Sequence, residues 1–222
     1  MPNRASGLAW DEPDTTAQGG LTRSEVVRAA MELADGEGLD AVSIRRVAAK
    51  LDVRPMSLYT HIASKDDLLD LMLNETVGEA LVPEPLPGGW REALRQIARY
   101  SYDAFVAHPW VLRAFARPQQ LGPNVLRHGE QSAAAVAGLG LEARDALTVL
   151  STVDDYVVGH ALRVLTARKR GDEQIRIPEF DPEELPNLAR VAPHINASSP
   201  DATFEFGLEL VLDGIEKRFL SG

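Results

Sequence analysis

Helical periodicity is the feature that most constrains the fold of this chain. Val26, Ala30 and Leu33 recur at three- and four-residue intervals, and Thr22 with Glu25 three residues later predicts a capping box at the start of that helix. No segment alternates apolar and polar residues as a half-buried strand does, and no internal repeat is visible. The sequence therefore predicts an all-α protein.

Further helices are expected wherever the same spacing returns. The expected ranges are 44–51, 55–62, 65–81, 90–107, 123–137, 141–170 and 203–219, with short helices leading to residue 117 and over 183–190. The run VPEPLPGG at 82–89 interrupts this pattern and predicts a break between an N-terminal unit and the rest. Residues 1–20 have no apolar period and are expected to form a disordered arm.

Composition excludes several classes of protein. The chain has 222 residues and no cysteine, so disulfides, thiolate metal sites and cysteine nucleophiles are excluded. It contains no run of eighteen apolar residues and no apolar signal core, which predicts a cytoplasmic protein without a membrane partner.

The charge of the chain is unevenly distributed. The net charge is −10, yet residues 43–65 contain five basic side chains and one acidic one, Asp52. A local basic patch on an acidic protein is typical of a surface that binds a polyanion such as DNA. The alternative, a solvated charged face without a partner, remains open on charge alone.

Residues 43–62 also have the pattern of two short helices joined by a tight turn. Ser43 can cap the first helix and Pro55 suits the start of the second, whose inward positions are Leu58 and Ile62. Such a pair presents its second helix to the major groove of DNA. Lys65 would begin the next helix, where a cation is unfavourable unless a phosphate binds there.

Residues 21–72 resemble the DNA-binding domain of the TetR family of bacterial regulators. The resemblance rests on LTRSEVVRAAMELADGEGLDAVSIRRVAAKLDVRPMSLYTHIASKDDLLDLM, which includes the family's Leu-Tyr-x-His and Lys-x-x-Leu signature. It implies a helix-turn-helix domain at 21–66 and a helical ligand-binding and dimerisation domain at 67–222. Asp52 replaces the glycine usual in the turn, and we expect it to adopt the left-handed conformation with slight strain.

The resemblance also implies roles for individual residues. Arg45 would reach a base edge, and the exposed second helix would face bases, while Tyr59, His61 and Lys65 would hold phosphates. The residues expected to bind DNA are Ser43, Arg45, Arg54, Pro55, Met56, Ser57, Tyr59, Thr60, His61 and Lys65.

The C-terminal segment predicts a homodimer. FEFGLELVLDGIEKRF, at 204–219, resembles the closing helix of the tetracycline-repressor subgroup and is apolar nearly all round. Gly207 and Gly214 would permit close helix approach, and a twofold dimer would require a palindromic operator. The expected interface residues are Phe204, Leu208, Val211, Leu212 and Ile215.

A small-molecule pocket is implied between the long helices of the body. The residues expected to line it are Leu81, Ile97, Ser101, Phe105, Arg113, Arg117, Gln131, Asp155, Tyr156 and His160. Where the subgroup binds magnesium with its drug, this chain places Arg113, Asp155 and Arg163, and two arginines repel a cation. We therefore expect no metal or cofactor and a fairly apolar ligand, with an anionic or carbonyl group near Arg113 or Arg117.

Together these features predict a repressor that a small ligand releases from DNA. Other functions are weighed against this prediction. Catalysis is not expected, because Asp155 and His160 are five residues apart, about 140° around a helix, and no hydrolase or phosphate-loop motif is present. A transcriptional activator of the same fold, or a ligand-binding module without DNA binding, remains an alternative.

Overall fold

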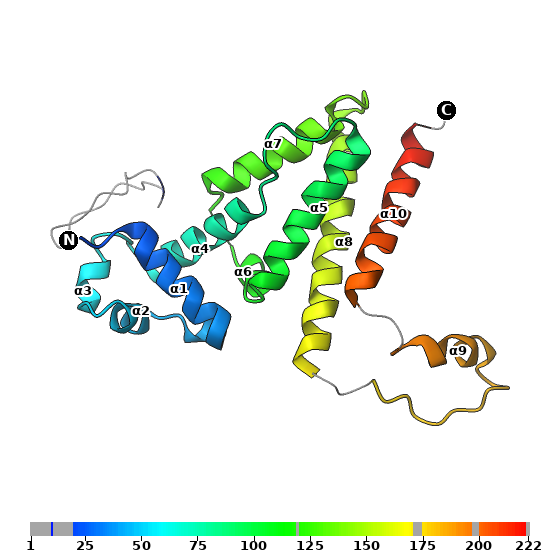
Figure 1. Cartoon of the computed structure of the whole chain (residues 1–222), viewed down its shortest axis with the longest axis horizontal. Coiled ribbons are helices and arrows are strands. Elements are labelled where there is room, and N and C mark those ends of the chain that lie inside the picture. The colour runs from blue at the N-terminus through cyan, green and yellow to red at the C-terminus, as the bar shows by residue number, and fades with distance from the viewer. Residues whose placement is uncertain (1–9, 11–19, 119, 171–174, 197–199, 221–222) are drawn as a thin grey trace. The chain divides into compact units, whose positions relative to one another are not determined.

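The structure is a computed structural model that describes residues 10, 20–118, 120–170, 175–196 and 200–220 (Figure 1). These residues form helices and connecting loops without a strand, which confirms the predicted all-α class. In the same ranges, no helix is both long and apolar enough to cross a membrane.

The expected arm at 1–20 lies almost wholly outside the described residues. The helices are α1 (Arg23–Glu37), η1 (Leu39–Ala41), α2 (Ile44–Lys50), α3 (Pro55–Leu58), α4 (Lys65–Glu79), α5 (Trp90–Ala107), α6 (Val111–Phe115), α7 (Pro123–Ala137), α8 (Ala143–Arg170), α9 (Pro186–Val191), η2 (Ala192–His194) and α10 (Pro200–Phe219).

The chain packs as two compact units that divide between Gly140 and Leu141. The first unit holds α1 to α7, and the second holds α8 to α10. This division lies far from residue 66, because α4 packs against α1 as well as against α5, α6 and α7. The boundary expected at residue 66 divides the DNA-binding domain from the ligand-binding domain by function, and it stays a prediction.

Helix α4 is the centre of the first unit. Leu68, Met72 and Thr76 are fully buried, and all residues from 68 to 74 are buried, which covers the whole circumference of the helix. A helix that is buried on all sides is surrounded by neighbours. Since α4 follows the helix-turn-helix directly and contacts the body helices, it connects these two parts of the unit.

The predicted caps position the helix-turn-helix. Thr22 and Glu25 form the complete capping box of α1, and the Ser43 hydroxyl accepts from the Arg46 N–H at the start of α2. Asp52 has a φ of 54°, so the expected left-handed turn residue is confirmed. Helix α3 is shorter than predicted, since regular helix ends at Leu58 and turns continue beyond it.

Two asparagines join α4 to α7. The Asn74 Oδ1 accepts from the Asn124 N–H at 2.9 Å, and the Asn124 Nδ2 donates to the Asn74 carbonyl at 3.0 Å. Gly122 allows this approach, because a Cβ there would lie 2.6 Å from the Asn74 Cγ. The start of α7 is therefore fixed on the middle of α4.

The second unit is built on the pairing of α8 with α10 (Figure 1). Val153, Val157 and Ala161 on α8 are buried, as are Phe204 and Leu208 on α10. These positions follow the three- and four-residue spacing seen in the sequence, so the pairing uses the predicted apolar stripe.

Candidate functional site

The second helix of the helix-turn-helix is exposed on its outer side. Pro55, Met56, Ser57 and Thr60 are exposed, with Met56 at 73%, while Leu58 is fully buried and holds the helix on the core. An exposed methionine beside short polar side chains offers apolar contacts and hydrogen bonds that fit base edges in a groove. These four residues lie where the sequence placed them.

The five basic side chains of this region separate into two groups. Arg46 is paired with Glu37, and the Lys50 Nζ lies 2.8 Å from an oxygen of Glu32. Acidic side chains of α1 therefore balance both charges. Within the described residues, no hydrogen bond or ion pair engages the exposed side chains of Arg45, Arg54 or Lys65. The cations available to an external anion are therefore these three.

His61 differs from its predicted position. It is 8% exposed, and its Nε2 is buried without a hydrogen-bond partner, whereas the sequence analysis placed it on the outer surface. The reason is its spacing, because His61 lies three residues after Leu58 and shares its inward face. Tyr59 is 41% exposed, so its hydroxyl remains accessible as a hydrogen-bond donor to a phosphate. The Ser43 hydroxyl caps α2.

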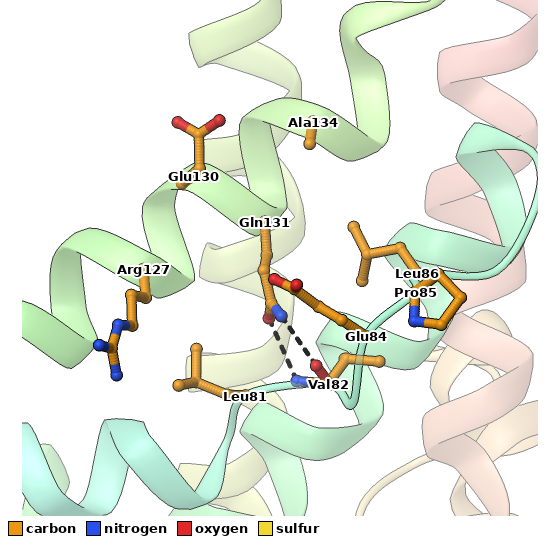
Figure 2. A pocket seen from close by; sticks show the side chains of 9 residues that line it. All are labelled: Leu81, Val82, Glu84, Pro85, Leu86, Arg127, Glu130, Gln131 and Ala134. Atoms are coloured by element: carbon orange, nitrogen blue, oxygen red, sulfur yellow. Dashed lines mark hydrogen bonds between the residues drawn. The ribbon is translucent and has the colours of Figure 1, made fainter.

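A cavity of about 730 Å³ lies between α7 and the segment that connects α4 to α5. Figure 2 shows Gln131 reaching from α7 to the backbone of Val82. Its Oε1 accepts from the Val82 N–H at 3.1 Å, and its Nε2 donates to the Val82 carbonyl at 2.7 Å. The cavity is lined by Leu81, Val82, Glu84, Pro85, Leu86, Arg127, Glu130, Gln131 and Ala134.

The structure brings only two of the expected pocket residues to this cavity, Leu81 and Gln131. The sequence analysis did not predict the lining residues Val82, Glu84, Pro85 and Leu86, because it interpreted VPEPLPGG only as a break in the chain, whereas the first half of this run forms a wall of the cavity. Proline-rich composition predicts a loop but gives no indication of what the loop packs against.

The two arginines expected to meet an anionic ligand group are already paired. Arg113 makes two hydrogen bonds to the carboxylate of Asp40, at 2.9 and 3.1 Å, and Arg117 pairs with Asp70 on α4. The Arg113 guanidinium holds the pKa of Asp40 below its usual range. Carboxylates of the same chain therefore occupy both side chains, and an anionic ligand group at this place stays a prediction.

Three further expected pocket residues of the first unit belong to its core. Ile97 is buried, Phe105 packs edge-on against Phe115 with ring centroids 5.6 Å apart, and the Ser101 hydroxyl lies 3.0 Å from His128 Nε2. Burial lowers the pKa of His128. These residues hold α5 against α6 and α7.

In the second unit, Tyr156 and His160 join α8 to α10. The Tyr156 hydroxyl donates to the Phe204 carbonyl at 2.6 Å, and the His160 ring packs edge-on against the Phe204 ring with centroids 5.3 Å apart. A Cβ at Gly207 would lie 2.9 Å from the Tyr156 ring, so this glycine serves contact within the protomer. Both residues therefore contact α10, and their assignment as ligand residues stays a prediction.

Asp155 is exposed on α8, beside Asp154. Although part of Asp154 is accessible, surrounding chain atoms desolvate its carboxyl group, and the Asp155 charge adds to this effect. Together they raise the pKa of Asp154 to about 6. The two carboxylates diverge around the helix, so they form no common site with His160.

The expected dimer stripe is buried within the protomer. Phe204, Leu208, Leu212 and Ile215 are at most 6% exposed, and Val211 is only partly accessible. Four of the five residues therefore already pack against their own chain, and the assignment of the set to a dimer interface stays a prediction. The apolar side chains left exposed on α8 and α10 are Leu147, Val158, Leu162, Phe206 and Leu210.

Comparison with known proteins agrees with this architecture. Residues 26–72 match the model of bacterial regulatory proteins of the tetR family, and residues 82–219 match that of the tetracyclin repressor-like C-terminal domain. The chain belongs to the TetR family. It is therefore a DNA-binding transcriptional regulator, and the family resemblance noted in the sequence is confirmed.

Known members of the TetR family align with nearly the whole chain. The transcriptional repressor DrrR1 of Streptomyces coeruleorubidus is 34% identical over 96% of this chain and 85% of its own length. ActR of Streptomyces coelicolor, solved in complex with actinorhodin, is 30% identical, with a TM-score of 0.77 over 90% of this chain and 99% of its own. BioQ of Mycobacterium smegmatis, solved with its double-stranded DNA operator, is 26% identical, with a TM-score of 0.61 over 87% of this chain and 97% of its own.

Proposed function

We propose that the protein is a homodimeric repressor that binds a palindromic operator and leaves it when a small, fairly apolar, metal-independent molecule binds. The observation that carries this proposal is the outer face around α3. Met56, Ser57 and Thr60 are exposed, and the exposed side chains of Arg45, Arg54 and Lys65 make no hydrogen bond or ion pair in the described part of the chain. The first set offers contacts to base edges, and cations can bind phosphates or, in the case of arginine, a base.

The three cations have different proposed roles. Arg45, near the start of α2, is the residue proposed to read a base, since a bidentate arginine contact to guanine discriminates by about 1 to 3 kcal/mol. Lys65 is the first residue of α4, where free N–H groups and the helix dipole also favour a phosphate. Arg54, directly before α3, adds a further backbone contact.

The cavity beside Gln131 is the proposed effector site. Leu81, Leu86 and Ala134 give it apolar walls, and Glu84 with Arg127 supplies charge. A relative, ActR, is known in complex with a small molecule, which supports the proposal of an effector for this chain. The effector would act by binding one arrangement of α4 more tightly than the other, typically by about 1 to 3 kcal/mol.

A second copy of the chain is the proposed partner of the exposed apolar side chains on α8 and α10. Leu162, Phe206 and Leu210 are each more than half exposed in the single chain. Covering such side chains removes apolar surface from water, which favours association. A twofold dimer would place two α3 helices about 34 to 36 Å apart along DNA.

Selection of binding sites from genomic or random-sequence DNA tests the proposal. The wild-type protein should enrich a palindrome, Arg45→Ala should relax one position in each half-site, and Lys65→Ala should weaken all sequences alike. Arg176→Ala, an exposed arginine outside the proposed DNA, effector and dimer surfaces, is the matched control and should change neither. Enrichment of no sequence by the wild-type protein would refute the proposed function.

A further inference from the structure

His108 is held between two carboxylates from two different helices. It follows α5, and its Nδ1 lies 2.8 Å from an oxygen of Asp35 on α1. Its Nε2 lies 2.9 Å from an oxygen of Glu79, the last residue of α4. Ionised carboxylates only accept hydrogen bonds, so both ring nitrogens must carry a hydrogen. This arrangement therefore requires the positively charged imidazolium.

Trp110 strengthens the same contact. Its indole Nε1 donates to the Asp35 oxygen that also faces His108, at 2.7 Å, and Trp110 itself is 3% exposed. The end of α1 is thus joined to the connection between α5 and α6 by two donors on one carboxylate. Because α1 belongs to the helix-turn-helix, this contact ties the DNA-binding part to the body of the unit.

The ring is placed so that its charge can change. Burial lowers the pKa of His108, but the hydrogen bonds and charges of Asp35 and Glu79 outweigh burial and hold this pKa above its ordinary value. The side chain is 12% exposed and lines a groove of about 380 Å³ between α1 and α4, so solvent protons can reach it. The other charged residues around this groove are Arg23, Arg28 and Glu32 from α1 and Glu75 from α4.

We propose that His108 is a proton-operated latch that fixes α1 against α4 and the connection between α5 and α6. This proposal rests on the proposed function, because its consequence is a change in DNA affinity. Loss of one proton leaves a ring nitrogen with a lone pair directed at a carboxylate, and leaves Asp35 and Glu79 without the cation between them. The latch is complete below the ordinary pKa of histidine and opens as pH rises through the raised pKa of His108.

Opening the latch should weaken binding to the operator. A dimer must present two α3 helices at one fixed separation, and a helix-turn-helix with fewer restraints spends less time in that arrangement. Because the latched state raises the pKa of His108, the protonated ring favours this state more strongly than the neutral ring does. We therefore expect operator affinity to fall as pH rises.

The test compares operator affinity between about pH 6 and 9 at constant salt in the wild-type protein and in His108→Gln. His128→Gln is the matched control, since His128 is also half-buried but its ring contacts Ser101. Across this range the wild-type affinity should fall at least about threefold more than that of His108→Gln, and His128→Gln should follow the wild type. Equal pH dependence in the wild type and His108→Gln would overturn the latch.

A second measurement needs no DNA. An NMR titration of the histidine rings, with His108 assigned by its absence in His108→Gln, should give His108 a pKa above the ordinary value. Asp35→Asn and Glu79→Gln should each lower it. A His108 that titrates at or below the ordinary value would also overturn the proposal. If no operator were recovered, the proposed function would fail while this titration still decided whether the latch exists.

Discussion

Replacing Gln131 with methionine tests how the effector cavity is built. The amide makes two buried hydrogen bonds to the Val82 backbone, at 3.1 and 2.7 Å, and Val82 is 3% exposed. Each bond contributes about 0.5 to 1.5 kcal/mol, and each backbone group left buried without a partner costs about 1 to 3 kcal/mol. Methionine has a similar volume and recovers part of this loss through its apolar surface. Gln131→Met should therefore lower the free energy of unfolding by about 2 to 4 kcal/mol.

Denaturant unfolding at fixed protein concentration measures this difference, with hydrogen exchange at residues 81–86 as a local readout. Arg127→Met is the matched control, because Arg127 lies one turn earlier on α7 and lines the same cavity. No hydrogen bond or ion pair engages its side chain within the described ranges, so its replacement should change stability by less than about 0.5 kcal/mol. Equal effects of the two substitutions would refute the argument that the amide holds the connection between α4 and α5.

Four further substitutions test backbone strain, close packing and desolvation. Asp52→Gly should raise the free energy of unfolding by about 0.5 to 1 kcal/mol, because glycine adopts the left-handed turn without strain; a less stable variant would contradict this. Gly122→Ala should destabilise by about 1 to 3 kcal/mol through its clash with Asn74, whereas Gly129→Ala, which faces open space on α7, should stabilise by about 0.5 to 1 kcal/mol. Asp154→Asn should stabilise the fold increasingly as pH rises from about 4 to 6, since the raised pKa makes ionisation of Asp154 costly in the folded state; a constant difference in thermal unfolding would contradict this.

Local signals in the sequence predicted the helices because capping and periodicity are local properties. The capping box at Thr22, the cap at Ser43 and the proline at the start of α3 all appear in the structure as predicted. Leu58 was correctly assigned to the core for the same reason, since its spacing alone fixes its inward face. The turn at Asp52 also followed from a local preference, because aspartate tolerates positive φ better than most residues.

Pairing between distant residues was not visible in the sequence. Arg113 and Arg117 were expected to meet a ligand, yet their partners Asp40 and Asp70 lie 73 and 47 positions away. The sequence analysis assigned no role to the latch residue His108, for the same reason. A charged side chain on an apolar segment indicates that a partner exists, but sequence spacing does not identify that partner.

The C-terminal helix shows a second limit of sequence analysis. Its apolar stripe was correctly recognised as buried, but burial by the same chain and burial by a partner give the same pattern. Phe204 and Leu208 are covered by their own protomer, while Phe206 and Leu210, which lie outside the stripe, are left exposed. Only the packed structure separates these two sets.

The most direct test of the account is the salt dependence of operator binding by Lys65→Gln and Arg46→Gln. Removing one phosphate contact lowers the slope of log affinity against log salt by about 0.9, so a dimer that loses two contacts changes by about 1.8. Lys65→Gln should show this change, whereas Arg46→Gln should show little, because Arg46 is paired with Glu37. Equal changes in slope, or an unchanged slope for Lys65→Gln, would contradict the assignment of Lys65 to the DNA backbone.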